Sequence, residues 1–152
     1  MNYEAINFGK KFKLFDEQWR PKVIGEMNDY QFKIVKLEGD FVWHDHKNTD
    51  ETFIVLEGTL RIDFRDGAVH VSAGEMFVVP KGVDHKPYAE HEVKLLLIEP
   101  RGVLNTGDKG GDRHRRKRCL DLNNYRCVLL AQSGHWSPSR PLDFTVTMAR
   151  QP

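Results

Sequence analysis

One stretch decides the fold: Gly39-Asp-Phe-Val-Trp-His44-Asp-His46-Lys-Asn-Thr-Asp-Glu51-Thr-Phe-Ile-Val-Leu-Glu-Gly58. It predicts two strands joined by a polar turn at residues 47–50, because such residues favour a reversal of direction. Side chains alternate between the two faces of a strand, so His44 and His46 share one face, and Glu51 opens the next strand. Two imidazoles and one carboxylate that converge in a sheet form a nitrogen and oxygen ligand set for a divalent metal.

A second stretch, Gly74-Glu-Met-Phe-Val-Val-Pro80-Lys-Gly82-Val-Asp-His85, supplies a third histidine. Pro80 fixes its own φ and Gly82 can adopt positive φ, so we expect the chain to turn there and bring His85 over the first three ligands. The expected metal ligands are therefore His44, His46, Glu51 and His85, with one or two positions left for water or substrate. The alternative is a metal-free polar cluster, but burying four such side chains without a cation is costly.

The two stretches resemble the two motifs of the cupin superfamily, in the form of a small single-domain (type 2) cupin. The matching residues are Gly39, His44, His46, Glu51 and Gly58 in the first motif and Gly74, Pro80, Gly82 and His85 in the second. This chain has four residues between Gly39 and His44, where the family usually has five, and Ala89 stands at the family's asparagine position. The resemblance covers residues 22–108 and implies an all-β, double-stranded β-helix jelly-roll barrel that holds one metal ion.

The hydrophobic pattern from Pro21 to Pro100 independently predicts strands and no helix. Apolar residues alternate with polar ones, and Gly, Pro and Asp interrupt them, most clearly at Asp66-Gly67, which is a strong signal for a tight turn. Short strands at this spacing are typical of a sandwich or a closed barrel. The expected strands are 30–34, 41–46, 51–57, 60–64, 69–71, 76–79, 85–88 and 93–98.

The N-terminal segment differs, because Phe8, Phe12, Phe15 and Trp19 follow one another at helical spacing. This predicts a short N-terminal helix over residues 7–19, capped by Asn7 and ended by Pro21. Its aromatic stripe would pack on the outside of the barrel or against a partner subunit. Similar small cupins are often homodimers, so a homodimer is expected.

Composition predicts three segments: an N-terminal helical arm over residues 1–20, a barrel domain over 21–108 and a basic, poorly ordered tail over 109–152. The tail has nine Lys and Arg against three Asp and Glu, whereas residues 1–108 have 14 against 19, and Glu99 is the last glutamate. A basic tail can bind nucleic acid or acidic surfaces. The abrupt loss of glutamate favours the alternative, a segment without structural selection such as a shifted reading frame.

The chain shows no feature that points to a membrane or to secretion. Residues 1–20 contain no long apolar run, so we expect neither a signal peptide nor a membrane span, and a cytoplasmic location. The cysteines, Cys119 and Cys127, both lie in the tail, and their spacing is too weak a signal for a zinc site. Nucleic acid is not an expected partner, because the acidic domain is a poor docking surface for phosphate backbones.

The expected pocket is mostly apolar, and its lining residues are Val42, Phe53, Val55, Pro87 and Ala89. A small molecule is the expected ligand or substrate, and the cofactor is one divalent ion, Fe, Mn, Ni or Zn. Few acid–base groups are visible, which favours dioxygenase-like chemistry at the metal over a mannose-6-phosphate isomerase-like activity, since the latter needs basic groups and a positioned base. The other alternative is a non-catalytic cupin that binds a small ligand. No catalytic residue beyond the metal ligands is identified.

Overall fold

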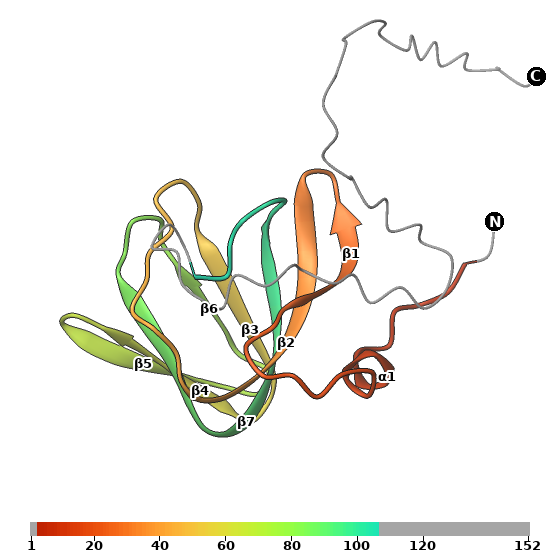
Figure 1. The fold of residues 1–152 in the computed structure, drawn as a ribbon, viewed down its shortest axis with the longest axis horizontal. Coiled ribbons are helices and arrows are strands. Elements are labelled where there is room, and N and C mark those ends of the chain that lie inside the picture. Colours follow the sequence, from red (N-terminus) through yellow and green to blue (C-terminus); the bar gives the residue numbers. More distant parts are fainter. Residues whose placement is uncertain (1–2, 107–152) are drawn as a thin grey trace, which may run out of the picture.

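A computed structural model describes residues 3–106 of the chain. In this part the chain forms one short helix and seven strands (Figure 1): α1 Phe8–Phe12, β1 Lys22–Met27, β2 Tyr30–Asp40, β3 Glu51–Glu57, β4 Thr59–Phe64, β5 Gly67–Ser72, β6 Met76–Val79 and β7 His85–Pro100. The predicted tail at 109–152, with its basic run and both cysteines, lies outside the described residues. All strand pairs are antiparallel, which confirms the all-β jelly-roll prediction.

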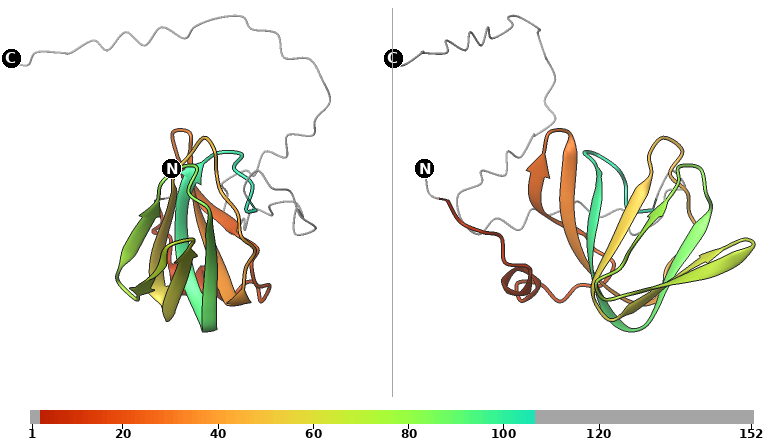
Figure 2. Two further views of the ribbon diagram at one scale, coloured as in Figure 1. Left: turned by 90° about the vertical axis from the view of Figure 1, so that its left-hand side faces the viewer. Right: turned by 180° about the vertical axis from the view of Figure 1, so that it is seen from behind.

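The long strand β7 holds the two layers of the barrel together. Its C-terminal half pairs with β2 and β3, in a sheet of order β1-β2-β7-β3-β6, and its N-terminal end, residues 85–88, pairs with β4. The β4–β5 hairpin therefore forms the second layer, on the opposite side of the molecule from the β1–β2 hairpin (Figure 2). A single strand that crosses between the layers brings the start of β7 close to the start of β3.

Most strand predictions are confirmed, and β3 has the predicted bounds. The expected strands at 85–88 and 93–98 are one continuous strand, β7. The strand predicted at 41–46 is wrong, since the described residues after Asp40 form a loop until Glu51, with a single bridge between His44 and His85. No helix occurs between residues 21 and 100, as predicted.

The N-terminal helix is present but much shorter than predicted. Asn7 caps it as expected, its side chain accepting a hydrogen bond from the Lys10 N–H at 2.9 Å. The helix ends at Phe12 instead of continuing to residue 19, so the aromatic stripe divides. Phe12 and Phe15 pack on the outer face of the sheet, while Trp19, with φ +59°, turns into the barrel and stacks on Phe41 at 4.7 Å between ring centroids.

Two hydrophobic clusters follow from the alternation of side chains across the sheet. The interior cluster contains Val35 and Leu37 of β2 together with Leu95 and Leu97 of β7. The outer cluster is built from residues of opposite parity and is covered by α1; it contains Phe12, Phe15, Ile24, Ile34 and Leu96. The parity of a residue on β2, β3 or β7 therefore tells whether its side chain faces the barrel interior.

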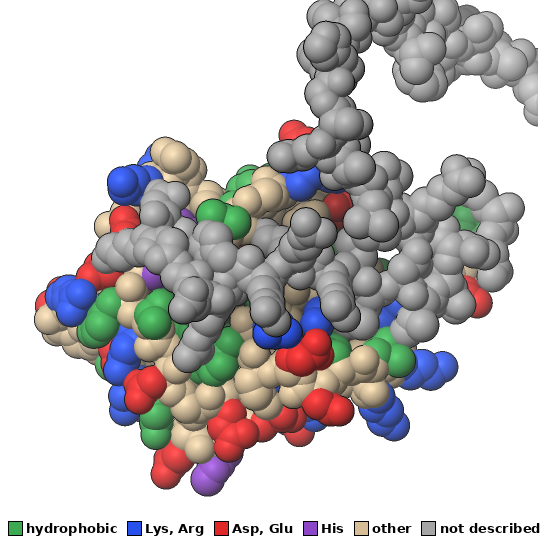
Figure 3. Space-filling model, viewed as in Figure 1, with side chains coloured by type: hydrophobic (Ala, Val, Ile, Leu, Met, Phe, Trp, Pro, Cys, Tyr) green, Lys and Arg blue, Asp and Glu red, His purple; other side chains and the backbone are tan. Residues whose placement is uncertain are grey.

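The described part of the chain has a surface of mixed character and one short helix. The face seen in Figure 3 carries acidic, basic and hydrophobic side chains intermixed over the described part of the chain. The helix in residues 3–106 has five residues, far fewer than a membrane crossing requires.

Candidate metal centre

Two of the predicted ligands stand at the first residues of regular strands. Glu51 begins β3 and lies opposite Val79 of β6. His85 begins β7, pairs with Phe64 of β4 on one side and forms the bridge with His44 on the other. Strand β4 on one side and the bridge to His44 on the other fix the backbone of His85, and the side chains of Glu51 and His85 are almost fully buried.

The other two ligands, His44 and His46, lie in the loop at residues 41–50, and backbone hydrogen bonds fix this loop to the segment before β7. The His44 N–H donates to the His85 carbonyl at 3.0 Å, and the His85 N–H donates back at 2.9 Å. The Gly82 N–H donates to the His46 carbonyl at 2.8 Å. The two histidines therefore both turn inward, as predicted, although no regular strand carries them.

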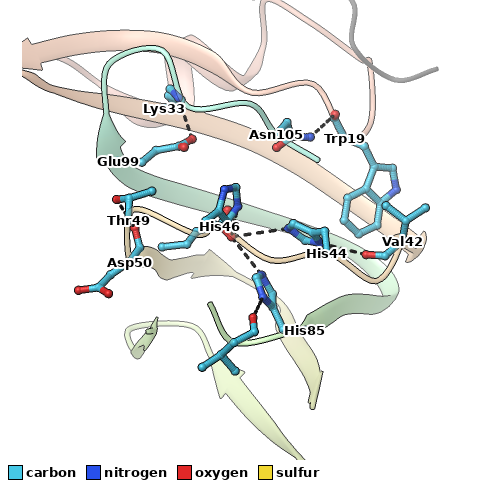
Figure 4. Close-up of polar contacts among 12 residues, drawn as sticks. Trp19, Lys33, Val42, His44, His46, Thr49, Asp50, His85, Glu99 and Asn105 are labelled. Atoms are coloured by element: carbon cyan, nitrogen blue, oxygen red, sulfur yellow. Dashed lines mark hydrogen bonds and ion pairs between the residues drawn. The ribbon is translucent and has the colours of Figure 1, made fainter. Parts of the chain in front are cut away.

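All three imidazoles direct Nε2 at the same oxygen, Oε2 of Glu51, at 3.1 Å from His46, 3.1 Å from His85 and 3.7 Å from His44. Figure 4 shows the three histidines gathered at this place. The ligand atoms of His44, Glu51 and His85 all lie within 4.8 Å of one another, a compact set compatible with one metal ion. His46 reaches Glu51 but stands outside this compact set.

Two of the histidines have their ring orientation set by the backbone. Nδ1 of His44 lies 3.0 Å from the Val42 carbonyl oxygen, and Nδ1 of His85 lies 2.9 Å from the Val83 carbonyl oxygen. A carbonyl only accepts, so each Nδ1 carries the proton and donates. In a neutral ring the proton on Nδ1 leaves a lone pair on Nε2, which is the form that binds metals.

The charge of Glu51 also suits a cation. Burial by itself would raise the pKa of Glu51, but the contacts with His44, His46 and His85 outweigh burial and hold this pKa well below its usual range. Glu51 is therefore ionised at neutral pH, the state in which a carboxylate binds a metal.

An arginine on the outer side links the two segments that carry His44 and His85. The Arg65 guanidinium lies 3.7 Å from the centroid of the Trp43 ring, and its Nε donates to Asp84 at 2.8 Å. Trp43 and Asp84 directly precede His44 and His85, so Arg65 contacts both segments without touching a ligand. The sequence analysis did not identify Arg65, because its partners are distant in the chain.

A small apolar cavity of about 20 Å³ lies beside the cluster, and two of the residues expected to line a pocket, Phe53 and Pro87, lie along it. The other predicted lining residues do not. Val55 and Ala89 are buried in the interior core, and Val42 points outward with 46% of its surface exposed, because the backbone around it is not a regular strand. Leu95 and Leu97 also line it, from a strand expected to add leucine to the pocket. The lining residues that were not predicted are Trp19, Val35, Leu37, Phe41 and Asn105.

The sequence analysis also missed an ion pair inside the barrel. Lys33 of β2 is 0% exposed, and its Nζ lies 2.7 Å from Oε1 of Glu99 on β7, which is 2% exposed. Buried Lys and Glu are rare unless they are paired. No short sequence signal identifies them, since they are 66 residues apart.

Comparison with known proteins agrees with the two sequence motifs. The model of the cupin domain family matches residues 32–99. A crystal structure of a cupin-2 domain containing protein from Shewanella frigidimarina has 63% sequence identity and a TM-score of 0.63, over 64% of this chain and 95% of that one. A crystal structure of a protein from Neisseria meningitidis has 40% identity and a TM-score of 0.59, over 64% and 99% of the two chains. The uncharacterized protein YdbB of Bacillus subtilis is 42% identical over 77 residues, 50% of this chain and 68% of that protein.

Proposed function

Since this chain belongs to the cupin family, we propose that it is a metal-dependent protein in which His44, His46, Glu51 and His85 bind one divalent ion. The observation that carries this proposal is the convergence of three Nε2 atoms on one carboxylate oxygen. Without a metal, the Glu51 carboxylate accepts hydrogen bonds from these rings, as its lowered pKa indicates. Loss of the Nε2 protons would leave three nitrogen lone pairs and one carboxylate at a single point, which is a donor set for a divalent cation.

The residues fit a metal in number, type and surroundings. Three imidazoles and one carboxylate suit Fe(II), Mn(II), Ni(II) or Zn(II) and leave positions open for a ligand. The carbonyls of Val42 and Val83 hold two of the rings in the metal-binding tautomer. When bound, such an ion would act as a Lewis acid or as a redox centre.

Among the possible reactions we favour oxygenation of a small molecule. The cavity beside His44 and Glu51 is lined mainly by aromatic and aliphatic side chains, and its volume of about 20 Å³ is the size of one water or one diatomic molecule. An apolar cavity of that size suits O₂ and keeps bulk water away from the cluster. The lysine inside the barrel, Lys33, is already paired with Glu99. This pairing counts against a phosphate-binding role for Lys33 and therefore against an isomerase acting on sugar phosphates.

The first test is elemental analysis of protein purified without added metal and without a metal-chelating tag. We expect one divalent ion per chain in the wild type and a large loss in His46→Ala. The sharper test is O₂ consumption by Fe(II)-loaded protein with a panel of small substrates. Turnover that needs O₂ and disappears in His46→Ala supports oxygenation. Saturable binding of a substrate without turnover would contradict oxygenation and support a ligand-binding role instead. Absence of a bound divalent ion would overturn the proposed metal site.

We also propose that the protein forms a homodimer. Tyr3, Ile6, Phe8 and Leu14 around α1 leave apolar surface exposed, as do Met76 and Val78 on β6, which pairs with β3 as an edge strand. Light scattering coupled to size-exclusion chromatography tests the assembly: a dimer mass supports the proposal and a monomer mass at micromolar concentration contradicts it.

A further inference from the structure

The buried ion pair between Lys33 and Glu99 faces the inside of the barrel. Lys33 has the parity of Val35 and Leu37 on β2, and Glu99 has the parity of Leu95 and Leu97 on β7, and all four of those apolar residues belong to the interior cluster. The alternating residues Ile34 and Leu96 belong to the outer cluster under α1. The pair therefore stands on the same interior wall as the cavity lining.

Strand register places this pair next to the metal cluster. β3 and β7 pair with Thr52 opposite Ile98 and Phe53 opposite Leu97. One step further along this register, Glu99 stands opposite Glu51. Residues opposite one another on antiparallel strands have Cβ atoms about 4.5–5.5 Å apart. Figure 4 shows the Lys33–Glu99 pair above the three histidines.

A third polar side chain extends this wall. Gln31 lies opposite Glu99 on β2, is 8% exposed, and its amide donates to Glu26 at 2.8 Å. Its carbonyl oxygen, Oε1, is buried and has no hydrogen-bond partner among residues 3–106. Buried polar atoms are satisfied in the great majority of cases, so an open acceptor at this place indicates a ligand or a water.

We propose that Gln31, Lys33 and Glu99 form a ligand-binding wall that recognises a hydroxyl group on a small metal-chelating acid. This inference rests on the proposed metal site. The wall combines a carboxylate, an amide carbonyl and an ammonium. A hydroxyl both donates and accepts, so it can bind the acceptor and the donor of this wall at once. The metal-binding end of the ligand, a carboxylate with an adjacent oxygen, would lie at the cluster, and its hydroxyl would lie at the wall.

The burial of Lys33 and Glu99 supports a functional role over a purely structural one. An apolar pair of similar volume usually stabilises a barrel at least as well as a buried ion pair, because two charges lose their hydration. The other interior-facing positions further along the same strands, such as Val35 on β2 and Leu95 on β7, carry apolar side chains. The polar side chains on this interior face are thus concentrated next to Glu51.

The test compares two probes that differ by one hydroxyl, D-glycerate and lactate, on full-length Co(II)-loaded protein. Both chelate a metal through the carboxylate and the 2-hydroxyl, and only glycerate has a 3-hydroxyl to reach the wall. Titration monitored by the visible Co(II) spectrum gives both dissociation constants. We expect wild type to bind glycerate about tenfold more tightly, since a hydrogen bond to a charged group contributes at least that factor.

The double variant Lys33→Met/Glu99→Leu should lose the preference for glycerate and keep wild-type affinity for Co(II) and lactate. The matched control is Lys94→Met/Glu57→Leu, which removes a 2.6 Å ion pair between β7 and β3 on the exposed side. It should keep the preference. Glu99→Gln, which retains the shape of the side chain, is the second variant if the double variant does not fold, and it should weaken the preference.

Equal affinity of wild type for the two probes overturns this inference, and so does a preference that survives in the variants at the wall. Those results leave the metal proposal standing, because the cobalt spectrum and its response to lactate report the metal site separately. Absence of any cobalt spectrum overturns the metal proposal and, with it, the recognition of a hydroxyl beside the metal.

Discussion

The four proposed ligands come from two kinds of backbone. Glu51 and His85 begin β3 and β7, where neighbouring strands determine the position of the main chain. His44 and His46 lie in a loop that is fastened to the chain around the start of β7 by backbone hydrogen bonds with Gly82, His85 and Pro87. The contact of Arg65 with Trp43 also holds this loop. The half of the site formed by Glu51 and His85 is rigid, whereas the position of the half formed by His44 and His46 depends on a few contacts. Substitution of the residues that make those contacts should change metal affinity without altering a ligand.

The largest effect should come from the rigid half, in Glu51→Gln. The neutral amide removes the charge on which three imidazoles converge. Loss of a residue that only supports a metal ligand lowers metal affinity about 10–100-fold, and loss of the ligand itself should lower it further. Competition with a chromophoric chelator measures this. Glu57→Gln, at the exposed end of the same strand, is the control and should bind metal as the wild type does. Wild-type affinity in Glu51→Gln would exclude Glu51 as a ligand.

The next effect tests the fastening of the loop. Arg65→Met removes the contacts with Trp43 and Asp84, and metal affinity should fall about tenfold while the melting temperature of the metal-free protein changes little. Arg61, on the strand β4 that precedes Arg65, is a matched control, since its guanidinium lies 4.3 Å from the Tyr88 ring centroid and 2.8 Å from Asp63. If Arg61→Met lowers metal affinity as much, the effect is not specific to the segments that carry histidines.

A smaller effect is expected at the turn that contacts His46. Gly82 has φ +76°, a conformation that costs an L-residue about 1–2 kcal/mol, and its N–H donates to the His46 carbonyl. Gly82→Ala should lower the free energy of unfolding by about that amount in urea denaturation. Gly67, the first residue of β5 after the tight turn, has no positive φ and no atom near its missing Cβ, so Gly67→Ala should be close to neutral. Equal effects in the two variants would contradict this reasoning.

The smallest effect concerns acid stability of the metal-free protein. The pKa of Glu51 is lower in the folded state than in the unfolded chain, so the ionised carboxylate stabilises the fold above the unfolded pKa of about 4.3. This stabilisation is lost as the pH falls through the lower, folded-state pKa. Unfolding free energies measured across the acidic range should therefore fall more steeply in the wild type than in Glu51→Gln. Parallel curves would show that Glu51 does not titrate as described.

The sequence motifs made much of the site predictable. The spacing of His44, His46, Glu51 and His85 led to a cluster that the structure brings around one carboxylate oxygen. The alternation of residues 51–57 predicted β3 with its observed bounds. Strand parity accounts for the inward direction of Glu51, whereas His44 and His46 turn inward because backbone hydrogen bonds with His85 and Gly82 orient their loop.

Local rules failed where a distant partner decides the outcome. The helical spacing up to Trp19 predicted one long helix, but Trp19 leaves that pattern because Phe41 and Lys36 offer it a stacking partner and a backbone acceptor inside the barrel. Val42 turns outward because its neighbours belong to a loop. Helical periodicity is only a weak preference, and tertiary contacts override it.

The amino-acid sequence by itself determined the alternating strands, the turns and the types of ligand, because these depend on residues close together in the chain. Only the tertiary structure decided that Lys33 and Glu99 meet inside the barrel beside Glu51. A lysine in a strand is ordinarily read as exposed, and its burial became favourable only when β7, returning 66 residues later, placed a carboxylate 2.7 Å from its ammonium.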